Sequence, residues 1–267
     1  MATNPANAKG RPLAGLHILN GRPQGQAAEL TRALEAAGAR VRELPLLEIV
    51  PLPETAEQRA VLQNLDQYQH VIAVSPNAAH FLTDALDRWW PQTPVGIHWY
   101  GVGAGTARVL TEAGLMPRIP EAGHDSEALL QRPELQTLTG EKVLLCRGRG
   151  GRETLPETLE ARGARVTRLA FYERRCPAYT ETTLKSALVD FAPQVIVVMS
   201  GETLNNLIAL GQNTDHQLLS RTVLVPVARV AEQARERGFT QVLVPDALDP
   251  ASIMACLADH RKGPEAP

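Results

Sequence analysis

Hydrophobic and polar residues alternate along the chain with two different periods. Short apolar runs rich in β-branched residues are typical of buried parallel strands. They occur at 16–19, 71–74, 95–102, 143–145, 195–199, 222–227 and 242–244. Stretches with helical spacing separate these runs, as at 24–37, where Ala27, Leu30 and Leu34 share one face. This alternation predicts an α/β protein with parallel sheets flanked by helices.

Proline and glycine mark the ends of the predicted helices. Pro23 is expected in the first turn of the helix over 24–37, because proline is tolerated where the backbone N–H has no helical partner. Glycine adopts the left-handed conformation that commonly terminates a helix. We therefore predict that four helices end at Gly38, Gly114, Gly163 and Gly238.

The chain contains an internal repeat with a constant offset of 125 residues, the difference between positions 38 and 163. The tetrapeptide Gly-Ala-Arg-Val at 38–41 recurs at 163–166. At the same offset, Arg22 corresponds to Arg147 and Ser75 to Ser200. We interpret this as a duplication that produced two similar α/β domains.

Two extended segments, 41–52 and 166–177, occupy equivalent places in the two halves. Prolines at 45, 51 and 53 exclude a helix in the first of them. We expect the two segments to pair as a two-stranded β linker, so that each domain is discontinuous in sequence. The predicted ranges are 11–43 with 175–260 for domain 1, 52–165 for domain 2, 44–51 and 166–174 for the linker, and 1–10 and 261–267 for flexible tails.

Composition and charge exclude several classes of protein. The 267 residues are 44% hydrophobic, which allows substantial cores, and the formal net charge is −2. Such a balance does not favour binding to nucleic acid or to an anionic membrane. The chain lacks both a signal-like apolar start and a run of about 18 apolar residues. We expect a cytoplasmic monomer that binds neither nucleic acid nor membrane.

Cysteine and histidine spacing predicts no metal site. Cys146, Cys176 and Cys256 lie far apart, so neither a disulfide framework nor a thiolate zinc site is indicated. We expect all three to be buried, reduced thiols. The seven histidines include no His-x-x-x-His pair, and the chain contains no phosphate-binding P-loop motif.

Candidate functional residues follow the predicted strands, because ligands of parallel sheets bind beyond the carboxyl ends of the strands. The hydroxyls, amide and glycine placed there are those of Ser75, Asn77, Gly103, Thr106 and Ser200. Helix N-termini at these positions offer N–H groups to an anion. Neither serine lies in a Gly-x-Ser-x-Gly elbow, so covalent acyl chemistry is not predicted.

Arginines and one tyrosine complete the candidate site. Arg147 and Arg152 lie on a glycine-rich turn, and Arg22 stands at the equivalent turn of the first half. Guanidinium groups bind carboxylates or phosphates through paired hydrogen bonds, which suits a polyanion, although solvated surface arginines are the alternative. Tyr172 could donate a hydrogen bond from an uncharged side chain, or simply pack by its ring.

Five motifs follow one another along the chain: Arg-Pro-Gln at 22–24, the strand and Ser-Pro-Asn-Ala over 71–78, the Gly-rich turn 101–107, the Arg-Gly turn 147–152, and Phe-Tyr-Glu at 171–173. In this order they resemble uroporphyrinogen-III synthase, over about residues 15–257. The resemblance implies two domains with a two-stranded linker, and no cofactor or metal. It implies cyclisation of hydroxymethylbilane to uroporphyrinogen III, with loss of water and inversion of the last ring.

The resemblance also suggests roles for individual residues. It places Tyr172 as the acid that assists the departing hydroxyl, and Ser75, Thr106 and Ser200 as groups that orient the substrate. The substrate carries eight carboxylates, which suits a site rich in arginine. A transient contact with the enzyme that supplies this unstable substrate stays open.

Three other functions remain open from the residues alone. A non-catalytic, hinged protein that binds a polyanionic small molecule such as a tetrapyrrole would use the same groups. A nucleotide-using enzyme would rest on the Gly-rich turn at 101–106, although Thr106 stands where the dinucleotide motif has its third glycine. RNA binding would rest on the Arg-Gly turn at 147–152.

Overall fold

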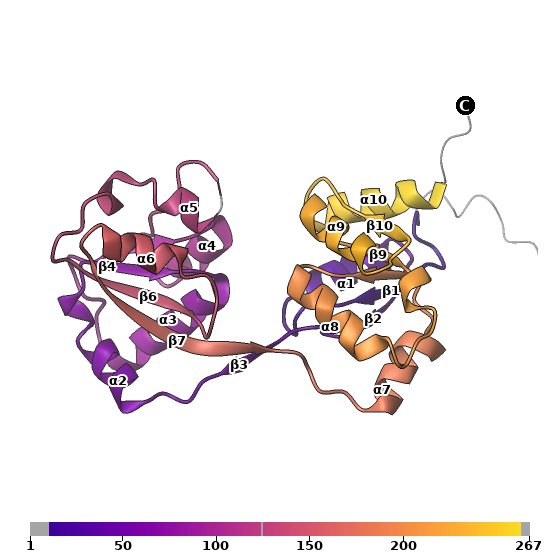
Figure 1. Ribbon diagram of the computed structural model, residues 1–267, viewed down its shortest axis with the longest axis horizontal. Helices are drawn as coiled ribbons and strands as arrows, with labels where there is room; N and C mark the ends of the chain where they lie inside the picture. The colour runs from indigo at the N-terminus through magenta and orange to yellow at the C-terminus, as the bar shows by residue number, and fades with distance from the viewer. Residues whose placement is uncertain (1–10, 124, 263–267) are drawn as a thin grey trace, which may run out of the picture. The chain divides into compact units, whose positions relative to one another are not determined.

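The computed structural model describes residues 11–123 and 125–262. The chain divides into two compact units (Figure 1): unit 1 combines the part up to Glu48 with the part from Arg175 onward, and unit 2 spans Ile49–Arg174. The chain passes between the units in two strands, β3 (Glu48–Pro51) and β7 (Arg165–Arg175). These strands are neighbours in one sheet, where the Leu52 N–H donates to the Phe171 carbonyl at 2.8 Å.

Unit 1 is built on sheet A, a five-stranded sheet with the order β10-β9-β8-β1-β2 and parallel pairing throughout. Its strands are β1 (His17–Asn20), β2 (Arg40–Glu43), β8 (Val195–Val197), β9 (Thr222–Leu224) and β10 (Gln241–Leu243). One face packs against α1 (Ala28–Ala36) and α10 (Pro250–Lys262). The other packs against α7 (Glu181–Lys185), η4 (Ser186–Asp190), α8 (Gly201–Gly211), η5 (Leu218–Ser220) and α9 (Ala228–Glu236).

Unit 2 is built on sheet B, with the order β3-β7-β6-β4-β5 and parallel pairing from β7 to β5. The strands not yet introduced are β4 (His70–Ala73), β5 (His98–Gly101) and β6 (Lys142–Gly148). One face packs against α2 (Ala56–Gln63), η2 (Leu65–Gln67), α3 (Pro76–Trp89) and α4 (Ala104–Glu112). The other packs against α5 (Ser126–Leu129), η3 (Pro133–Leu135) and α6 (Thr154–Ala161).

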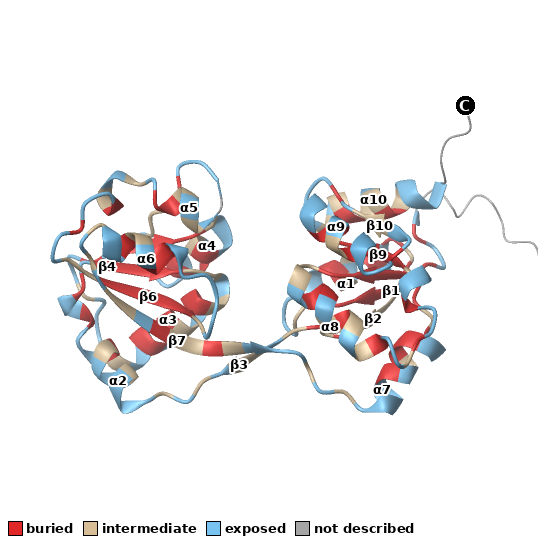
Figure 2. Cartoon of the chain, in the orientation of Figure 1, coloured by how far each residue is buried: buried red, intermediate tan, exposed pale blue. Residues whose placement is uncertain are grey.

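The central strands are apolar on both faces, as Figure 2 shows by their burial. In β4, Val71 and Ala73 face the α3 side, while Ile72 faces the α6 side. Side chains alternate between the faces of a strand, so a sheet covered by helices on both sides requires an unbroken apolar run. The predicted α/β fold with parallel sheets flanked by helices is confirmed.

The 125-residue repeat reappears in the order of the elements. Adding 125 to the residue numbers of β1, α1 and β2 brings them onto those of β6, α6 and the start of β7. The same shift carries β4, α3, β5 and α4 onto β8, α8, β9 and α9. Four strands of each sheet therefore share one order, β9-β8-β1-β2 in sheet A and β5-β4-β6-β7 in sheet B, but each sheet combines strands from both halves of the chain. Sheet A takes β1 and β2 from the first half, and sheet B takes β6 and β7 from the second.

All four predicted helix ends are confirmed. Gly38, Gly114, Gly163 and Gly238 have φ angles of 94°, 79°, 93° and 98°. At the first of them, the Gly38 N–H donates to the Glu35 carbonyl at 2.9 Å, and the Ala39 N–H donates to the Leu34 carbonyl at 3.0 Å. These bonds satisfy carbonyls that the helix leaves unpaired.

Several predicted boundaries were wrong. The strand expected over 95–102 is shorter, and Val95 is 94% exposed. Helix α1 begins at Ala28, because Pro23 lies in a preceding turn, where its carbonyl accepts from the Gln26 N–H at 3.0 Å. The segment 41–52 is interrupted, with β2 in sheet A and β3 in sheet B.

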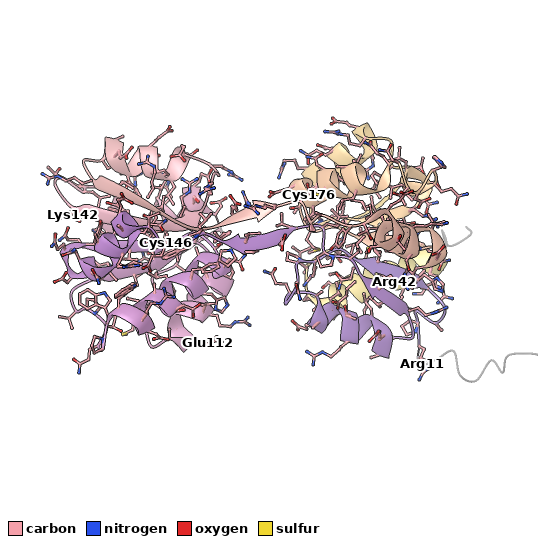
Figure 3. The ribbon with its side chains drawn as sticks, turned by 90° about the horizontal axis from the view of Figure 1, so that it is seen from below. Arg11, Arg42, Glu112, Lys142, Cys146 and Cys176 are labelled. Carbon is pink, nitrogen blue, oxygen red and sulfur yellow. The ribbon has the colours of Figure 1, made fainter. Side chains whose placement is uncertain are left out.

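The chain ends and the cysteines also differ from expectation. Helix α10 continues to Lys262 and so includes the first two residues of the predicted tail 261–267, while residues 1–10 and 263–267 lie outside the described residues. Cys146 is buried in β6, and burial raises the pKa of its thiol. Cys176 is exposed just beyond β7 (Figure 3), and Cys256 is partly exposed, so the prediction of three buried thiols was wrong. Within the described residues, no helix is long and apolar enough to cross a membrane.

Two arginines of unit 2 bind the Glu134 carboxylate, and this contact predicts how the stability of the fold changes at low pH. The Glu134 carboxylate accepts from Arg132 Nε at 3.1 Å and Nη2 at 3.0 Å, and lies 3.1 Å from Arg118 Nη1. Hydrogen bonds from Arg132 lower the pKa of Glu134 from 4.5 to about 2. A depressed carboxylate pKa stabilises the folded state above the unfolded pKa and loses this contribution as pH falls toward the folded pKa.

We therefore expect Glu134→Gln to reduce the free energy of unfolding at pH 7 by about 1 kcal/mol or less. The difference from wild type should shrink as pH falls from about 4.5 toward about 2. Urea unfolding at a series of pH values measures both effects. Glu112→Gln is the control, because its 66%-exposed carboxylate lies 3.7 Å from Arg108 and should matter little at any pH. A constant difference between wild type and Glu134→Gln across this range would contradict the prediction.

Candidate active site

Unit 2 contains a pocket of about 330 Å³ at the carboxyl ends of the sheet B strands. It is formed by the segments that follow β4, β5 and β6, by the end of β7, and by the start of α5. Its polar and glycine lining consists of Ser75, Asp125, Ser126, Glu127, Arg147, Gly148, Gly150, Gly151, Arg152, Tyr172 and Arg174. Four of the predicted site residues, Ser75, Arg147, Arg152 and Tyr172, therefore lie together in one unit.

An irregularity in the sheet orients Tyr172. Arg147 pairs with Ala170, but the next pair is Gly148 with Tyr172, so β7 contains one extra residue at Phe171. Such a bulge changes the face toward which the following side chains point. As a result both Phe171 and Tyr172 pack on the side of sheet B that α3 covers.

The ring of Tyr172 is tightly held, with only 4% of the residue exposed. Phe81 of α3 stacks on it, with ring centroids 5.6 Å apart. On β6, a Cβ atom added to Gly148 would lie 2.7 Å from Tyr172 Cε2, closer than packed carbon atoms approach. Glycine at 148 thus leaves the space that the tyrosine ring fills.

The phenol oxygen of Tyr172 lies 2.9 Å from Ser75 Oγ, and either oxygen can donate this hydrogen bond. Ser75 is the N-cap of α3, where its hydroxyl oxygen accepts from the Ala78 N–H at 3.1 Å. Serine is favoured at this position because its side chain satisfies an N–H at the start of the helix. Ser75 therefore links Tyr172 to the N-terminus of α3.

The arginines of the glycine-rich turn are paired with carboxylates. Arg147 is only 7% exposed; its Nη1 donates to Glu153 at 2.8 Å and its Nη2 to the Gly150 carbonyl. Hydrogen bonds from Arg147 and Arg168 lower the pKa of Glu153. Arg152 is different, because its side chain is 78% exposed and lies 3.2 Å from Glu127 across the pocket. Arg147 shapes the turn, whereas Arg152 presents its charge to solvent.

Backbone geometry explains why glycines occur in the two candidate turns, at 101–107 and 147–152. Gly150 and Gly151 have φ angles of 72° and 103°, which side-chain-bearing residues rarely adopt. A Cβ atom on Gly101 would lie 3.0 Å from the Ala107 nitrogen, so glycine allows α4 to start close to β5. Backbone geometry thus accounts for features that the RNA and nucleotide alternatives used.

Three further predicted residues lie in unit 2 but do not line the pocket. Asn77 is in the first turn of α3, and Gly103 is the N-cap of α4. Thr106 is buried inside unit 2 with 3% exposed, so the structure does not present it to a ligand. This burial argues against the predicted substrate contact of Thr106.

The remaining two predicted residues belong to unit 1, at the carboxyl ends of the neighbouring strands β1 and β8. Arg22 Nη2 donates to the Leu248 carbonyl at 3.1 Å. Its Nε is buried and has no hydrogen-bond acceptor among the described residues, and burial lowers the pKa of the guanidinium. Ser200 caps α8, accepting from the Thr203 N–H at 3.1 Å. An unsatisfied buried donor is costly, so Arg22 has the capacity to bind a further acceptor.

Sequence reasoning missed some residues of the pocket. Arg174 was detectable, because residues two apart in a strand share a face, and Arg174 follows Tyr172 by two. Gly148 could not be found in this way, nor could Phe81, which stacks on Tyr172 without lining the pocket, since their roles depend on the bulge and on the packing of α3. Asp125 and Glu127 lie at the N-terminus of α5, which the sequence did not predict as a helix.

The chemistry available in the pocket is limited to proton donation and charge pairing. It contains the Tyr172 phenol, two serine hydroxyls, the carboxylates of Asp125 and Glu127, and arginine side chains. Within the described residues, no group of three or more His, Cys, Asp or Glu side chains is placed to hold a metal ion. The arrangement suits an anionic substrate whose reaction needs one weak acid.

Close packing between Gly148 and Tyr172 yields a prediction. We expect Gly148→Ala to destabilise the protein by about 1–3 kcal/mol, because the added methyl group must displace the tyrosine ring. Thermal unfolding measures the loss. Gly105→Ala is the control. Gly105 lies in α4, and a Cβ atom added there would lie 3.5 Å from Pro76 Cγ, an ordinary van der Waals contact. A Gly148→Ala protein as stable as wild type would refute this account of the packing.

Comparison with known proteins places the chain in a family. Residues 28–255 match the family described as "Uroporphyrinogen-III synthase HemD". The uroporphyrinogen-III synthase of Escherichia coli K12 is 34% identical over 252 residues, which cover 91% of this chain and 100% of that protein. The Salmonella typhimurium protein of the same name is 36% identical over 248 residues, with coverages of 91% and 100%.

Solved structures share the fold at lower identity. A mutant uroporphyrinogen III synthase from Thermus thermophilus has a TM-score of 0.64 at 19% identity, covering 93% of this chain and 98% of its own. The Helicobacter pylori 26695 uroporphyrinogen-III synthetase has a TM-score of 0.58 at 15% identity, covering 92% and 99%. From the family match and the two bacterial relatives, the chain belongs to the uroporphyrinogen-III synthase family.

Proposed function

We propose that the protein is a uroporphyrinogen-III synthase, a lyase that cyclises hydroxymethylbilane to uroporphyrinogen III with loss of water and inversion of the last pyrrole ring. Family membership over residues 28–255 supports this assignment. The observation that carries it is the pocket of unit 2, where the phenol of Tyr172 lies together with arginine side chains and with Ser75, the N-cap of α3.

The first step of the proposed reaction is departure of the hydroxyl group. Tyr172 donates its proton to the leaving oxygen, which departs as water and leaves an electrophilic carbon on the substrate. The last ring attacks through its substituted carbon, and the resulting spiro intermediate fragments and recloses inverted. The proton released when the final ring regains aromaticity restores Tyr172, so the reaction consumes no acid.

Substrate carboxylates are proposed to bind guanidinium groups that are exposed or that have an N–H without a hydrogen-bond acceptor. Arg152 offers an exposed charge in the pocket that Tyr172 also lines. Unit 1, taken by itself, offers Arg22, whose buried Nε has no acceptor among the described residues. Arg147 acts mainly by holding the turn that carries Arg152. Correct folding of a flexible chain is a large part of the task, because positioning alone supplies much of the rate in such closures.

The products of the reaction test the assignment. Freshly generated hydroxymethylbilane is supplied to the purified protein, and the oxidised uroporphyrin isomers are separated by chromatography. We expect type III to dominate, whereas closure without enzyme gives type I. Type I alone, from folded protein, would contradict the proposal and favour a non-catalytic protein that binds a polyanion.

The role of Tyr172 has its own test. We expect Tyr172→Phe to lower kcat for type III formation by about 10²- to 10⁴-fold, the usual contribution of a general acid. The fold should be retained, because the phenyl ring still fills the space beside Gly148. Circular dichroism and thermal unfolding verify folding, and a variant with full activity would remove Tyr172 as the acid.

A further inference from the structure

We propose that Ser75 is the positioning residue of Tyr172: it holds the phenol in place and donates a hydrogen bond to the phenolate left after proton transfer. This inference rests on the proposed function. It assigns Ser75 to the proton donor rather than to direct contact with the substrate, which was the role suggested by the resemblance.

The hydrogen bond that Ser75 makes to its own helix leaves its proton and one lone pair for Tyr172. Its oxygen accepts from the Ala78 N–H at 3.1 Å, which occupies one lone pair. The hydroxyl proton and the second lone pair remain for the Tyr172 oxygen, 2.9 Å away. Ser75 can therefore accept from the phenol or donate to it, but once Tyr172 has lost its proton only donation from Ser75 is possible.

The repeat provides an internal comparison. Ser200, the counterpart of Ser75, caps α8 in the same way, but its hydroxyl lies 3.0 Å from Thr203 Oγ1 in a capping box. The residue equivalent to Thr203 in unit 2 is Ala78, which has no hydroxyl, and the position equivalent to Tyr172 in unit 1 is occupied by Leu47. The serine whose own helix offers no side-chain hydroxyl as a partner is thus the one that contacts the tyrosine.

The location of Ser75 also suits a negative charge. Helix α3 is 14 residues long, and the N-terminus of such a helix carries partial positive charge. Ser75 joins this end of the helix to the phenol oxygen through one hydroxyl. A phenolate formed at Tyr172 would therefore receive a hydrogen bond from a donor that is itself polarised by the helix.

The proposed proton transfer balances in atoms and charge. The Tyr172 O–H bond breaks as its proton joins the departing hydroxyl to form water. Ser75 keeps its own proton throughout and donates it only as a hydrogen bond. Tyr172 is reprotonated by the proton that the last pyrrole ring loses on aromatisation.

The test combines Ser75→Ala with Tyr172→Phe in a double-mutant cycle. We expect Ser75→Ala to lower kcat for type III formation about ten- to hundredfold with little change in KM, the range for a hydrogen bond to a charged group. In the Tyr172→Phe background, the same substitution should change kcat less than about twofold, because no phenolate forms. Ser75→Thr, which keeps a hydroxyl at the cap, should restore most of the activity.

Thr55→Ala is the matched control for the loss of a helix cap. Thr55 caps α2 in unit 2 through the Gln58 N–H at 3.2 Å and does not line the pocket. The Thr55→Ala substitution should lower the stability of the protein about as much as Ser75→Ala does, while leaving kcat unchanged. Should Ser75→Ala fail to fold, Ser75→Gly replaces it, since glycine is tolerated at an N-cap much better than alanine.

The outcomes separate this inference from the proposed function. Equal losses from Ser75→Ala in both backgrounds, or a rise in KM alone, would overturn the positioning role. Full activity of Tyr172→Phe would overturn it as well, by removing the acid that Ser75 serves. Absence of type III product from the wild-type protein would instead reject the function itself.

Discussion

The register shift between β6 and β7 is the constraint on which the chemistry of unit 2 depends. In a regular strand Tyr172 would point to the face opposite that of Leu169, three residues before it. The extra residue at Phe171 returns Tyr172 to the face that α3 covers, within reach of Ser75. Gly148, which pairs with Tyr172 across the shift, provides the space for the ring. One irregular pair thus brings the Tyr172 phenol to the serine at the start of α3.

The two units show how one architecture can take on different chemistry. Both place a serine at the cap of the helix after an equivalent strand, and both place an arginine after the first strand of the repeat. In unit 2 the arginine is tied to Glu153 and braces a turn, while in unit 1 Arg22 keeps a buried nitrogen without an acceptor among the described residues. Equivalent positions have thus diverged: one arginine is paired within its own turn, and the other keeps a donor without an acceptor among the described residues.

Much of the fold was predictable because its physical signals are local. Buried parallel strands read as apolar runs, and glycine marked the four helix ends through its backbone freedom. The candidate site was predictable only as a set of residues at the strand ends. That Ser75 bonds to Tyr172, that Thr106 is buried and that Arg147 is internally paired all depend on side-chain packing and on a one-residue bulge. Neither leaves a periodic signal in the sequence.

The exchange of strands between the two halves affects the order in which the protein can form during synthesis. Unit 2 is one continuous stretch of chain, so it can fold as soon as its last strand leaves the ribosome. Unit 1 has to wait, since β1 pairs with β8 and Ile18 lies opposite Val195. Until then β1 and β2 lack the central strands of their sheet, and their apolar faces stay uncovered while most of the polypeptide is still being made.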